Sequence, residues 1–415
     1  MTTIQESAKS ARAASRIIAA TSGATRNAAL HAIAAGLRAN IAPILEANAK
    51  DLDAGRERGL DAAFLDRLML NEARIESMAI AVEEIAAQND PIGLVEQEIV
   101  RPNGIRVARE RIPLGVVAVI YEARPNVTSD AAALAIRSGN AVILKGGSDA
   151  SFSNEAVGKV VSAAIAEAGL PAEAVHVLVT KDRSEITEML KLDELIDVVI
   201  PRGGEGLIRF VTENSRIPVI KHFKGVCHVY VDKTVDFDMA REIVINAKIQ
   251  RPSACNAVET ILVHEDVAAA ILPLIAEDLI SRGSTLHGCE RTQAILGDRV
   301  VPATDEDWAA EYLSLEVAIR VVPSLDEAIL HIQRWNSDHT EAIVSNDIRA
   351  TQEFRARIQS ACVMVNASTR FADGGELGLG AEIGISTSRL HAYGPMGAEG
   401  LTTLRFVITG QGQVR

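Results

Sequence analysis

Apolar residues in the first ninety positions recur at intervals of three and four, which places them on one face of a helix. The segment Gln88-Asn89-Asp90-Pro91 carries turn-forming residues and ends this pattern. We therefore expect the chain to begin with a helical region. One apolar face of that region is formed by Leu30, Ile33, Leu37, Ile41 and Ile44.

From residue 116 onward, short apolar runs alternate with helical stretches. The runs are rich in Val and Ile without polar alternation, which is typical of strands buried on both faces of a parallel sheet. The pattern forms two successive blocks, so it predicts an α/β protein with two parallel-sheet lobes. The expected strands of the first block are 116–120, 141–144, 175–179, 198–200 and 229–231; those of the second are 260–263, 317–322, 342–344 and 363–365, followed by 402–409. The helices expected between them include 154–168, 236–248, 267–281 and 326–335.

A hairpin precedes the first block. Two strand-like runs, 96–100 and 105–109, flank the turn Arg101-Pro102-Asn103-Gly104, and Asn-Gly between such runs is a strong hairpin signal. A two-stranded ribbon this rich in charged residues is only marginally stable alone. We therefore expect it to pack on another element, and a second subunit is one candidate.

Composition and charge exclude several classes of protein. The chain has 415 residues, of which 48% are apolar, 23% charged and only 3% aromatic. These values exclude a disordered chain and speak against stacking platforms for single-stranded nucleic acid. A net charge of −13, from 42 basic and 55 acidic residues, makes binding to nucleic acid or an anionic membrane unexpected. The length allows two to three domains.

The cysteine usage indicates a reducing compartment. Cys227, Cys255, Cys289 and Cys362 lie far apart and form no CxxC pair, so neither a disulfide framework nor a metal site is expected. The N-terminus lacks the pattern of a signal peptide, and no apolar run is long enough for a membrane span. These features predict a cytoplasmic protein.

Two segments of the first block have the placement of a nucleotide site. Lys145 ends an apolar strand run before a glycine pair, and ligands of open α/β sheets bind outside the carboxyl ends of strands. Gly203 and Gly204 follow the expected strand 198–200 and open a helix, where backbone N–H groups can face an anion. The alternatives are that Lys145 is a solvated surface lysine and that Gly203 and Gly204 only form a tight strand-to-helix turn.

Two segments of the second block carry reactive or polar side chains. Cys255 lies between an expected helix and strand among small and polar residues, and Arg251 nearby favours its nucleophilic thiolate form. An inert cysteine fits this position as well. The long Gly-rich segment 365–391 contains Asn366, Arg370, Asp373, Glu376, Glu382, Arg389 and His391, and it reads either as a functional loop or as a solvated one.

Taken together, these segments resemble the γ-glutamyl phosphate reductase family, a branch of the aldehyde dehydrogenase superfamily. The resemblance extends from about Thr21 to the C-terminus. The strings that carry it are PLGVVAVIYEARPNVTSDAAALAIRSGNAVILKGG (113–147), VIPRGGEGLI (199–208), IPVIKHFKGVCHVYVD (217–232), NAKIQRPSACNAVETILVH (246–264), TEAIVSND (340–347) and VNASTRFADGGELGLGAEIGISTSR (365–389).

The resemblance implies a reaction and a nucleophile. L-Glutamyl 5-phosphate and NADPH give L-glutamate 5-semialdehyde, NADP⁺ and phosphate, the second step of proline biosynthesis. Cys255 is similar in position to the superfamily nucleophile, whose thioester accepts the hydride. The superfamily pattern places an oxyanion hole at the Cys255 N–H and at an amide of the loop 121–126. Here Arg124 takes the position of the superfamily asparagine; we therefore expect Asn126 to bind the oxyanion and Arg124 the phosphate, although loop capping explains both.

A departure from the superfamily pattern suits a reductase. The Glu-Leu-Gly-Gly segment that carries the general base of hydrolytic relatives is replaced by His222-Phe-Lys-Gly225. Without that base, water is not activated against the thioester. A role for His222 in protonating the aldehyde oxygen stays open beside a structural one.

Cofactor and substrate contacts are also implied by the resemblance. NAD-preferring relatives often carry a glutamate where this chain has Ser148, so Lys145 with Ser148 favours NADPH. Gly203 and Gly204 match the pyrophosphate-side loop, and Glu311 matches the glutamate that holds the nicotinamide ribose. For the substrate we expect contacts from Arg124 and Arg251. We expect Glu382 to bind its amino group and Arg389 its carboxylate, and a structural ion pair between these two residues is an equal alternative.

The expected organisation follows the aldehyde dehydrogenase pattern. Residues 1–94 and 114–231 form an NADP(H)-binding domain, 232–400 a catalytic domain, and 95–113 with 401–415 an oligomerisation ribbon that predicts a homo-oligomer. A glutamate kinase that delivers the substrate is then a separate protein. Two rivals remain: a CoA-acylating aldehyde dehydrogenase and a non-catalytic scaffold subunit.

Overall fold

The structure, a computed structural model, describes residues 3–179 and 183–415. The chain divides into two compact units. The first comprises Met1–Lys221, Gly378–Gly384 and Pro395–Arg415, and the second comprises His222–Leu377 and Ile385–Gly394. The boundary therefore follows Lys221 and not residue 231, and two short segments expected in the catalytic domain return to the first unit.

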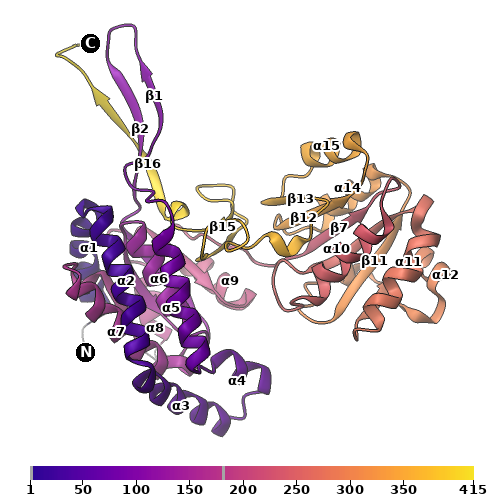
Figure 1. The fold of residues 1–415 in the computed structure, drawn as a ribbon, viewed down its shortest axis with the longest axis horizontal. Helices are drawn as coiled ribbons and strands as arrows, with labels where there is room; N and C mark the ends of the chain where they lie inside the picture. Colours follow the sequence, from indigo (N-terminus) through magenta and orange to yellow (C-terminus); the bar gives the residue numbers. More distant parts are fainter. Residues whose placement is uncertain (1–2, 180–182) are drawn as a thin grey trace. The chain divides into compact units, whose positions relative to one another are not determined.

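The N-terminal region of the first unit is helical, as the spacing of its apolar residues predicts (Figure 1). Side chains of Thr3, Ser22, Asp61 and Asn71 accept hydrogen bonds from N–H groups of the following helical turn, which fixes where four helices begin. No single described helix is long and apolar enough to cross a membrane; only the bent pair α2 and α3 reaches that length and hydropathy together. The helices are α1 (Ile4–Ala20), α2 (Gly23–Ala39), α3 (Ile41–Glu57), α4 (Ala62–Leu68) and α5 (Glu72–Ala87).

The core of the first unit is a four-stranded parallel sheet in the order β5-β4-β3-β6. Every residue of β3 and β4 is buried, which explains why both read as continuous apolar runs. The run predicted at 175–179 forms a strand only as far as Val177, and residue 180 lies outside the described residues. The strands are β3 (Val116–Tyr121), β4 (Ala141–Lys145), β5 (Val175–Val177) and β6 (Val198–Arg202); the helices that accompany them are α6 (Asn126–Arg137), α7 (Ser151–Glu167), α8 (Arg183–Met189) and α9 (Glu205–Asn214).

The second unit is built on a seven-stranded sheet in the order β10-β9-β11-β8-β7-β12-β13, with parallel pairing throughout. β7 was expected in the first lobe, and this is corrected: it pairs with β8 and β12. A buried apolar run has the same pattern in either sheet, so only its pairing partners assign it. The strands are β7 (Cys227–Val231), β8 (Val258–His264), β9 (Thr285–Gly288), β10 (Val301–Pro302), β11 (Glu316–Val322), β12 (Thr340–Val344) and β13 (Cys362–Val365).

Helices of the second unit flank this sheet. Those predicted from apolar spacing are present, with ends shifted by a few residues, whereas the short strands β9 and β10 were missed because neither carries a long apolar run. The helices are α10 (Phe237–Ile249), α11 (Glu265–Ile280), α12 (Glu290–Leu296), α13 (Asp305–Trp308), α14 (Leu325–Trp335) and α15 (Ile348–Arg357); β14 (Gly384–Ser386) and β15 (Gly394–Met396) form a separate pair.

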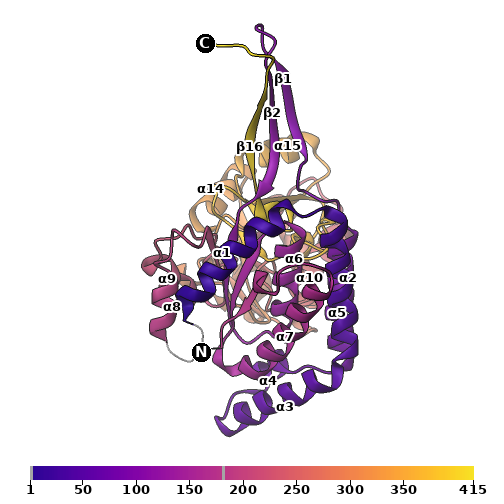
Figure 2. The ribbon, with the colours of Figure 1, turned by 90° about the vertical axis from the view of Figure 1, so that its left-hand side faces the viewer.

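A three-stranded antiparallel ribbon extends from the rest of the first unit (Figures 1 and 2). It consists of β1 (Val95–Val100), β2 (Arg106–Pro113) and β16 (Thr402–Thr409), with β2 in the middle. The predicted hairpin turn is present, and Gly104 supplies its positive φ of 86°. The third strand, β16, explains how so polar a hairpin is held.

Candidate active site

Cys255 lies in the turn that links α10 to β8 in the second unit, and it is neither buried nor fully exposed. We call this turn, residues 250–257, the nucleophile turn after the role predicted for Cys255. Two hydrogen bonds hold it: Ala257 N–H donates to Ala254 O at 2.9 Å, and the Asn256 amide donates to Ala372 O at 3.0 Å. Within the described part of the chain, the backbone N–H of Cys255 donates to no protein group. The thiol therefore lies beside an available backbone donor, as an oxyanion hole requires.

Gly225 lies against the backbone of this turn. A Cβ added at Gly225 would lie 1.9 Å from Cys255 O, so only glycine allows the two segments to approach this closely. The Gly225 N–H donates to a carboxylate oxygen of Glu311 at 2.8 Å. The segment 222–225 thus packs against the nucleophile turn, and its Gly225 also bonds to Glu311.

A second thiol bonds to the backbone of Cys255. Cys227, the first residue of β7, is fully buried and donates to Cys255 O at 3.3 Å. Burial raises the pKa of the Cys227 thiol well above its ordinary value, so this group stays protonated and acts as a donor. The nucleophilic role of Cys255 stays a prediction; Cys289 and Cys362 are likewise neither buried nor fully exposed.

The nucleophile turn also rests on a buried ion pair that sequence reasoning missed. Lys248 ends the buried face of α10 and donates to Glu259 of β8 at 2.7 Å, and both side chains are fully buried. Burial raises the pKa of Glu259 to about 7 and lowers that of Lys248. The pair links the two elements on either side of Cys255. A lysine on the apolar face of the predicted helix was the available signal.

Arg370, which the sequence placed in the long polar segment 365–391 without a role of its own, lies close to the nucleophile turn. Its Nε donates to Gln250 at 2.8 Å, which ties the loop after β13 to the residues before Cys255. Burial lowers the pKa of Arg370, and the positive charge of Arg251 acts in the same direction. Arg251 itself is exposed. The second unit therefore holds two guanidinium groups close to each other beside the nucleophile turn.

In the first unit, the structure places Lys145 and Ser148 at one end of β4. Lys145 is 6% exposed, its Nζ donates to Gly146 O at 2.6 Å, and burial lowers its pKa. Ser148 is exposed, and its hydroxyl contacts none of the described residues. Gly146 packs closely against Asn154, because a Cβ there would lie 2.0 Å from the Asn154 amide nitrogen and that side chain would have to shift. The donors at this strand end suit ribose hydroxyls and phosphate.

The glycine turn after β6 differs from the simple anion site that was expected. Glu122 reaches this turn, and its carboxylate accepts the Gly204 N–H at 3.2 Å. A Cβ at Gly203 would lie 2.6 Å from the Glu122 carboxyl carbon, whereas one at Gly204 would meet open space. A carboxylate of the chain itself therefore lies where an anion was expected, and pyrophosphate contact at this turn stays a prediction.

Asn126 is exposed at the first turn of α6, and its amide donates to Asp130 at 2.9 Å. One N–H of that amide is left for an oxyanion. Arg124 is exposed in the same loop. Asn126 belongs to the first unit and Cys255 to the second, so their joint role stays a prediction.

We expect Asp130 to make the free energy of unfolding depend on pH. Burial raises its pKa to about 6 from an ordinary value of 3.8, so folding favours the protonated carboxyl. That contribution is complete below pH 3.8 and is lost as pH rises through about 6. Asp130→Asn should therefore be more stable relative to the native protein at pH 7.5 than at pH 5 in urea unfolding. Equal differences at both pH values, or the same trend in Asp238→Asn, whose side chain is exposed, would contradict this.

The two residues expected at the substrate head group belong to different compact units, and their joint role stays a prediction. Glu382 belongs to the first unit and Arg389 to the second. Arg389 donates to Gln359 at 2.8 Å, with Asp338 at 3.8 Å, so its present partners are structural. His222 Nδ1 lies 2.9 Å from Ile385 O, which supports the structural alternative for that histidine.

Comparison with known proteins places these features in a family. The aldehyde dehydrogenase family model matches residues 1–287. The chain is 54% identical to the γ-glutamyl phosphate reductase of Citrifermentans bemidjiense, over 99% of this chain and 98% of that protein. This chain belongs to the γ-glutamyl phosphate reductase family. The family protein of Xanthomonas campestris pv. campestris is 52% identical, with all of both chains covered.

Solved structures agree with this family membership. The crystal structure of γ-glutamyl phosphate reductase from Thermotoga maritima matches with a TM-score of 0.97 at 45% identity, covering 99% of each chain. An acetylating aldehyde dehydrogenase from Geobacillus thermoglucosidasius shares the fold, with a TM-score of 0.73 at 16% identity over 99% of this chain and 97% of the other. The predicted aldehyde dehydrogenase-like fold and the resemblance to the γ-glutamyl phosphate reductase family are thus confirmed.

Proposed function

We propose that this chain reduces L-glutamyl 5-phosphate to L-glutamate 5-semialdehyde, with NADPH as the hydride donor and release of phosphate. Relatives more than half identical over the whole chain are named γ-glutamyl phosphate reductase, and this observation carries the proposal. Membership of the aldehyde dehydrogenase family assigns a nicotinamide cofactor and a small-molecule substrate. The CoA-acylating and scaffold alternatives have no comparable support.

In the proposed mechanism, the Cys255 thiolate attacks the acyl carbon of the substrate, and the carbon–oxygen bond to phosphate breaks with the electron pair leaving on phosphate. The resulting thioester accepts a hydride at the same carbon. Collapse of the thiohemiacetal oxyanion then expels the thiolate and releases the aldehyde. One proton is consumed overall and ends on the released phosphate. Covalent catalysis keeps the acyl group tethered between the two steps.

Donors for the oxyanion and for the leaving group are also part of the proposal. The Cys255 N–H has no partner among the described residues, which suits an oxyanion donor, and the Asn126 amide is proposed as the second donor. Arg251 and Arg370 are proposed to bind the departing phosphate, because guanidinium groups form paired hydrogen bonds with phosphate oxygens. Arg124, Glu382 and Arg389 remain proposed substrate contacts.

The residues at the end of β4 fit a nicotinamide dinucleotide. An ammonium group at Lys145 and a hydroxyl at Ser148 are the donors that an adenosine ribose and its phosphate require, and no carboxylate stands at position 148 to repel a 2′-phosphate. Glu311 is proposed to hold the nicotinamide ribose, and Gly203 with Gly204 to face the pyrophosphate. Bound there, NADPH would supply the hydride.

The reverse reaction tests the proposal, because the acyl phosphate is labile. Glutamate semialdehyde and NADP⁺ should give NADPH only when phosphate is present, and NAD⁺ should replace NADP⁺ poorly. Turnover that ignores phosphate would show that the acyl acceptor is water, and turnover that requires coenzyme A would favour the acylating relatives. A separate glutamate kinase is proposed to hand over the substrate.

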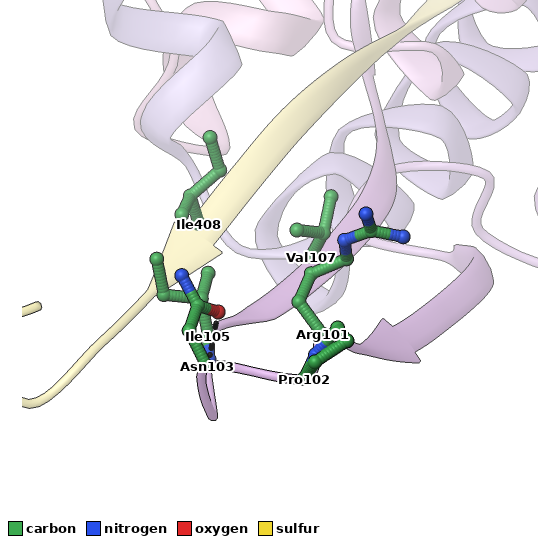
Figure 3. A pocket seen from close by; sticks show the side chains of 6 residues that line it. All are labelled: Arg101, Pro102, Asn103, Ile105, Val107 and Ile408. Carbon is green, nitrogen blue, oxygen red and sulfur yellow. Dashed lines mark hydrogen bonds between the residues drawn. The ribbon is translucent and has the colours of Figure 1, made fainter. Parts of the chain in front are cut away.

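We also propose that the ribbon joins copies of this chain. Phe406 and Ile408 of β16 are 64% and 65% exposed, although both are large and apolar. A pocket of about 430 Å³ opens at the tip (Figure 3). Exposed apolar side chains on a projecting element are typical of an interaction surface. The pocket is lined by Arg101, Pro102, Asn103, Ile105, Val107 and Ile408.

Replacing Phe406 and Ile408 together by serine should weaken self-association by at least about 100-fold, since each buried apolar side chain contributes roughly 1.5–3 kcal/mol. Light scattering should then show the mass of one chain, 44.3 kDa, at concentrations where the native protein is larger. Ile348→Ser, which changes a side chain that is 69% exposed on α15, is the control. A native protein that is already monomeric at micromolar concentration would contradict the role of the ribbon.

A further inference from the structure

Arg58 bonds to the residue that follows Ser148, although Arg58 and Ser148 are ninety residues apart in the sequence. It follows the last turn of α3, and its Nη1 donates to the carboxylate of Asp149, the residue next to Ser148. The short 3₁₀ helix Ser148–Ala150 carries both of these residues directly after Lys145 and its glycine pair. The guanidinium group is thus brought to the strand end where the nucleotide ribose is proposed to bind.

The packing between α3 and this 3₁₀ helix fixes that placement. Leu52 of α3 and Phe64 of α4 pack against a small core that includes Ala150. The buried Asp51 of α3 accepts the Ser153 N–H at 2.8 Å and the Ser153 hydroxyl at 2.6 Å at the start of α7. Arg58 therefore follows a helix, α3, that is fixed by apolar and polar contacts to the 3₁₀ helix and to the start of α7.

Arg58 keeps donors available. Its Nε donates to Ala54 O at 3.0 Å and its Nη1 to Asp149, while its Nη2 donates to none of the described residues. The side chain is 47% exposed, so solvent and ligands reach it. The Ser148 hydroxyl is also without a partner in the described structure. One available donor thus belongs to the arginine that bonds to Asp149, and the other to the residue that precedes Asp149.

We propose that Arg58 is the residue that recognises the 2′-phosphate of NADPH, with the Ser148 hydroxyl as its partner. The inference rests on the proposed function, because it assumes a nicotinamide dinucleotide at the end of β4. Asp149 holds the guanidinium in place through Nη1 and leaves Nη2 to donate to the phosphate. Arginine is suited to this role because its charge persists at every physiological pH and its planar donors match phosphate oxygens.

The test compares two adenine nucleotides that differ only in the 2′-phosphate. Adenosine 2′,5′-bisphosphate and adenosine 5′-monophosphate are titrated calorimetrically into the full-length protein, without any turnover. The native protein should bind the bisphosphate more tightly. Arg58→Gln should weaken bisphosphate binding at least about tenfold and leave monophosphate binding unchanged, because only the bisphosphate loses a charged hydrogen bond. Arg58→Lys should recover part of the loss.

The matched control is Arg56→Gln, which removes an arginine of the same helix that pairs with Asp53 at the surface. It should bind both nucleotides like the native protein. Equal weakening of both nucleotides in Arg58→Gln would show a structural role and overturn the inference, as would unchanged binding. Equal affinities of the native protein for the two nucleotides would also overturn it and leave a nicotinamide cofactor intact. Failure to bind either nucleotide would count against the proposed function itself.

Discussion

Replacing Cys255 by alanine is expected to abolish NADPH formation from glutamate semialdehyde, NADP⁺ and phosphate, with a loss of at least about 10⁴-fold in kcat. The thiolate is the only proposed group that bonds to the substrate carbon, and no neighbouring side chain can take its place. Cys227 is buried and its raised pKa keeps it protonated, so it offers no thiolate. The measurement is the rate of absorbance increase from NADPH at saturating substrate.

Cys289→Ala is the matched control for this experiment. Cys289 is also neither buried nor fully exposed, but it precedes α12 and bonds to Thr292 rather than to the nucleophile turn. It should keep native activity. Residual turnover in Cys255→Ala within tenfold of the native rate would remove the thioester from the mechanism. Binding of adenosine 2′,5′-bisphosphate should be unaffected by either change, which separates loss of chemistry from loss of fold.

Replacing Gly225 by alanine is expected to cause the second large loss of activity. The added Cβ would lie 1.9 Å from Cys255 O and 2.6 Å from its carbonyl carbon, and backbone atoms cannot be displaced as a flexible side chain can. The nucleophile turn must therefore shift by more than an ångström. A displacement of this size at a reacting group costs about 100-fold in rate. We expect kcat to fall by at least that factor, together with the rate of alkylation of Cys255 by iodoacetamide.

Gly206→Ala provides the comparison, because a Cβ at Gly206 in α9 meets open space. Its activity should match that of the native protein. Native kcat in Gly225→Ala would show that the approach of these two segments is not needed for catalysis. A fall in kcat with unchanged alkylation of Cys255 would place the defect elsewhere than at the nucleophile turn.

Much of this fold could be predicted from the sequence, because local physical requirements leave a visible pattern. The buried strands β3 and β4 need apolar side chains on both faces, and the turn at Gly104 needs a residue that tolerates positive φ. Which strands pair with one another leaves no such pattern in the local sequence. β7 was therefore predicted in the wrong sheet, and the short strands β9 and β10 passed unnoticed.

The candidate site shows the same division. Cys255, Lys145 and Ser148 could be chosen as candidates from their positions after strands and helices and from the family resemblance, and their roles stay predictions. The Arg58 contact could not, because it joins residues 91 positions apart in the sequence, and Lys248 left only the signal of a lysine on the apolar face of a predicted helix. Glu122 was missed for the same reason: nothing in the local sequence indicates that its carboxylate reaches the glycine turn after β6.

The path of the chain has a consequence for biosynthesis. β2 is the central strand of the ribbon, yet its partner β16 is made almost three hundred residues later, and the Asn140 amide likewise bonds to Leu401 O. At about 5–20 residues per second, a ribosome needs roughly 15–60 s to deliver that partner. During this interval the nascent chain presents an open strand edge, the feature on which chains associate wrongly. Chaperone demand should therefore peak before the last residues emerge.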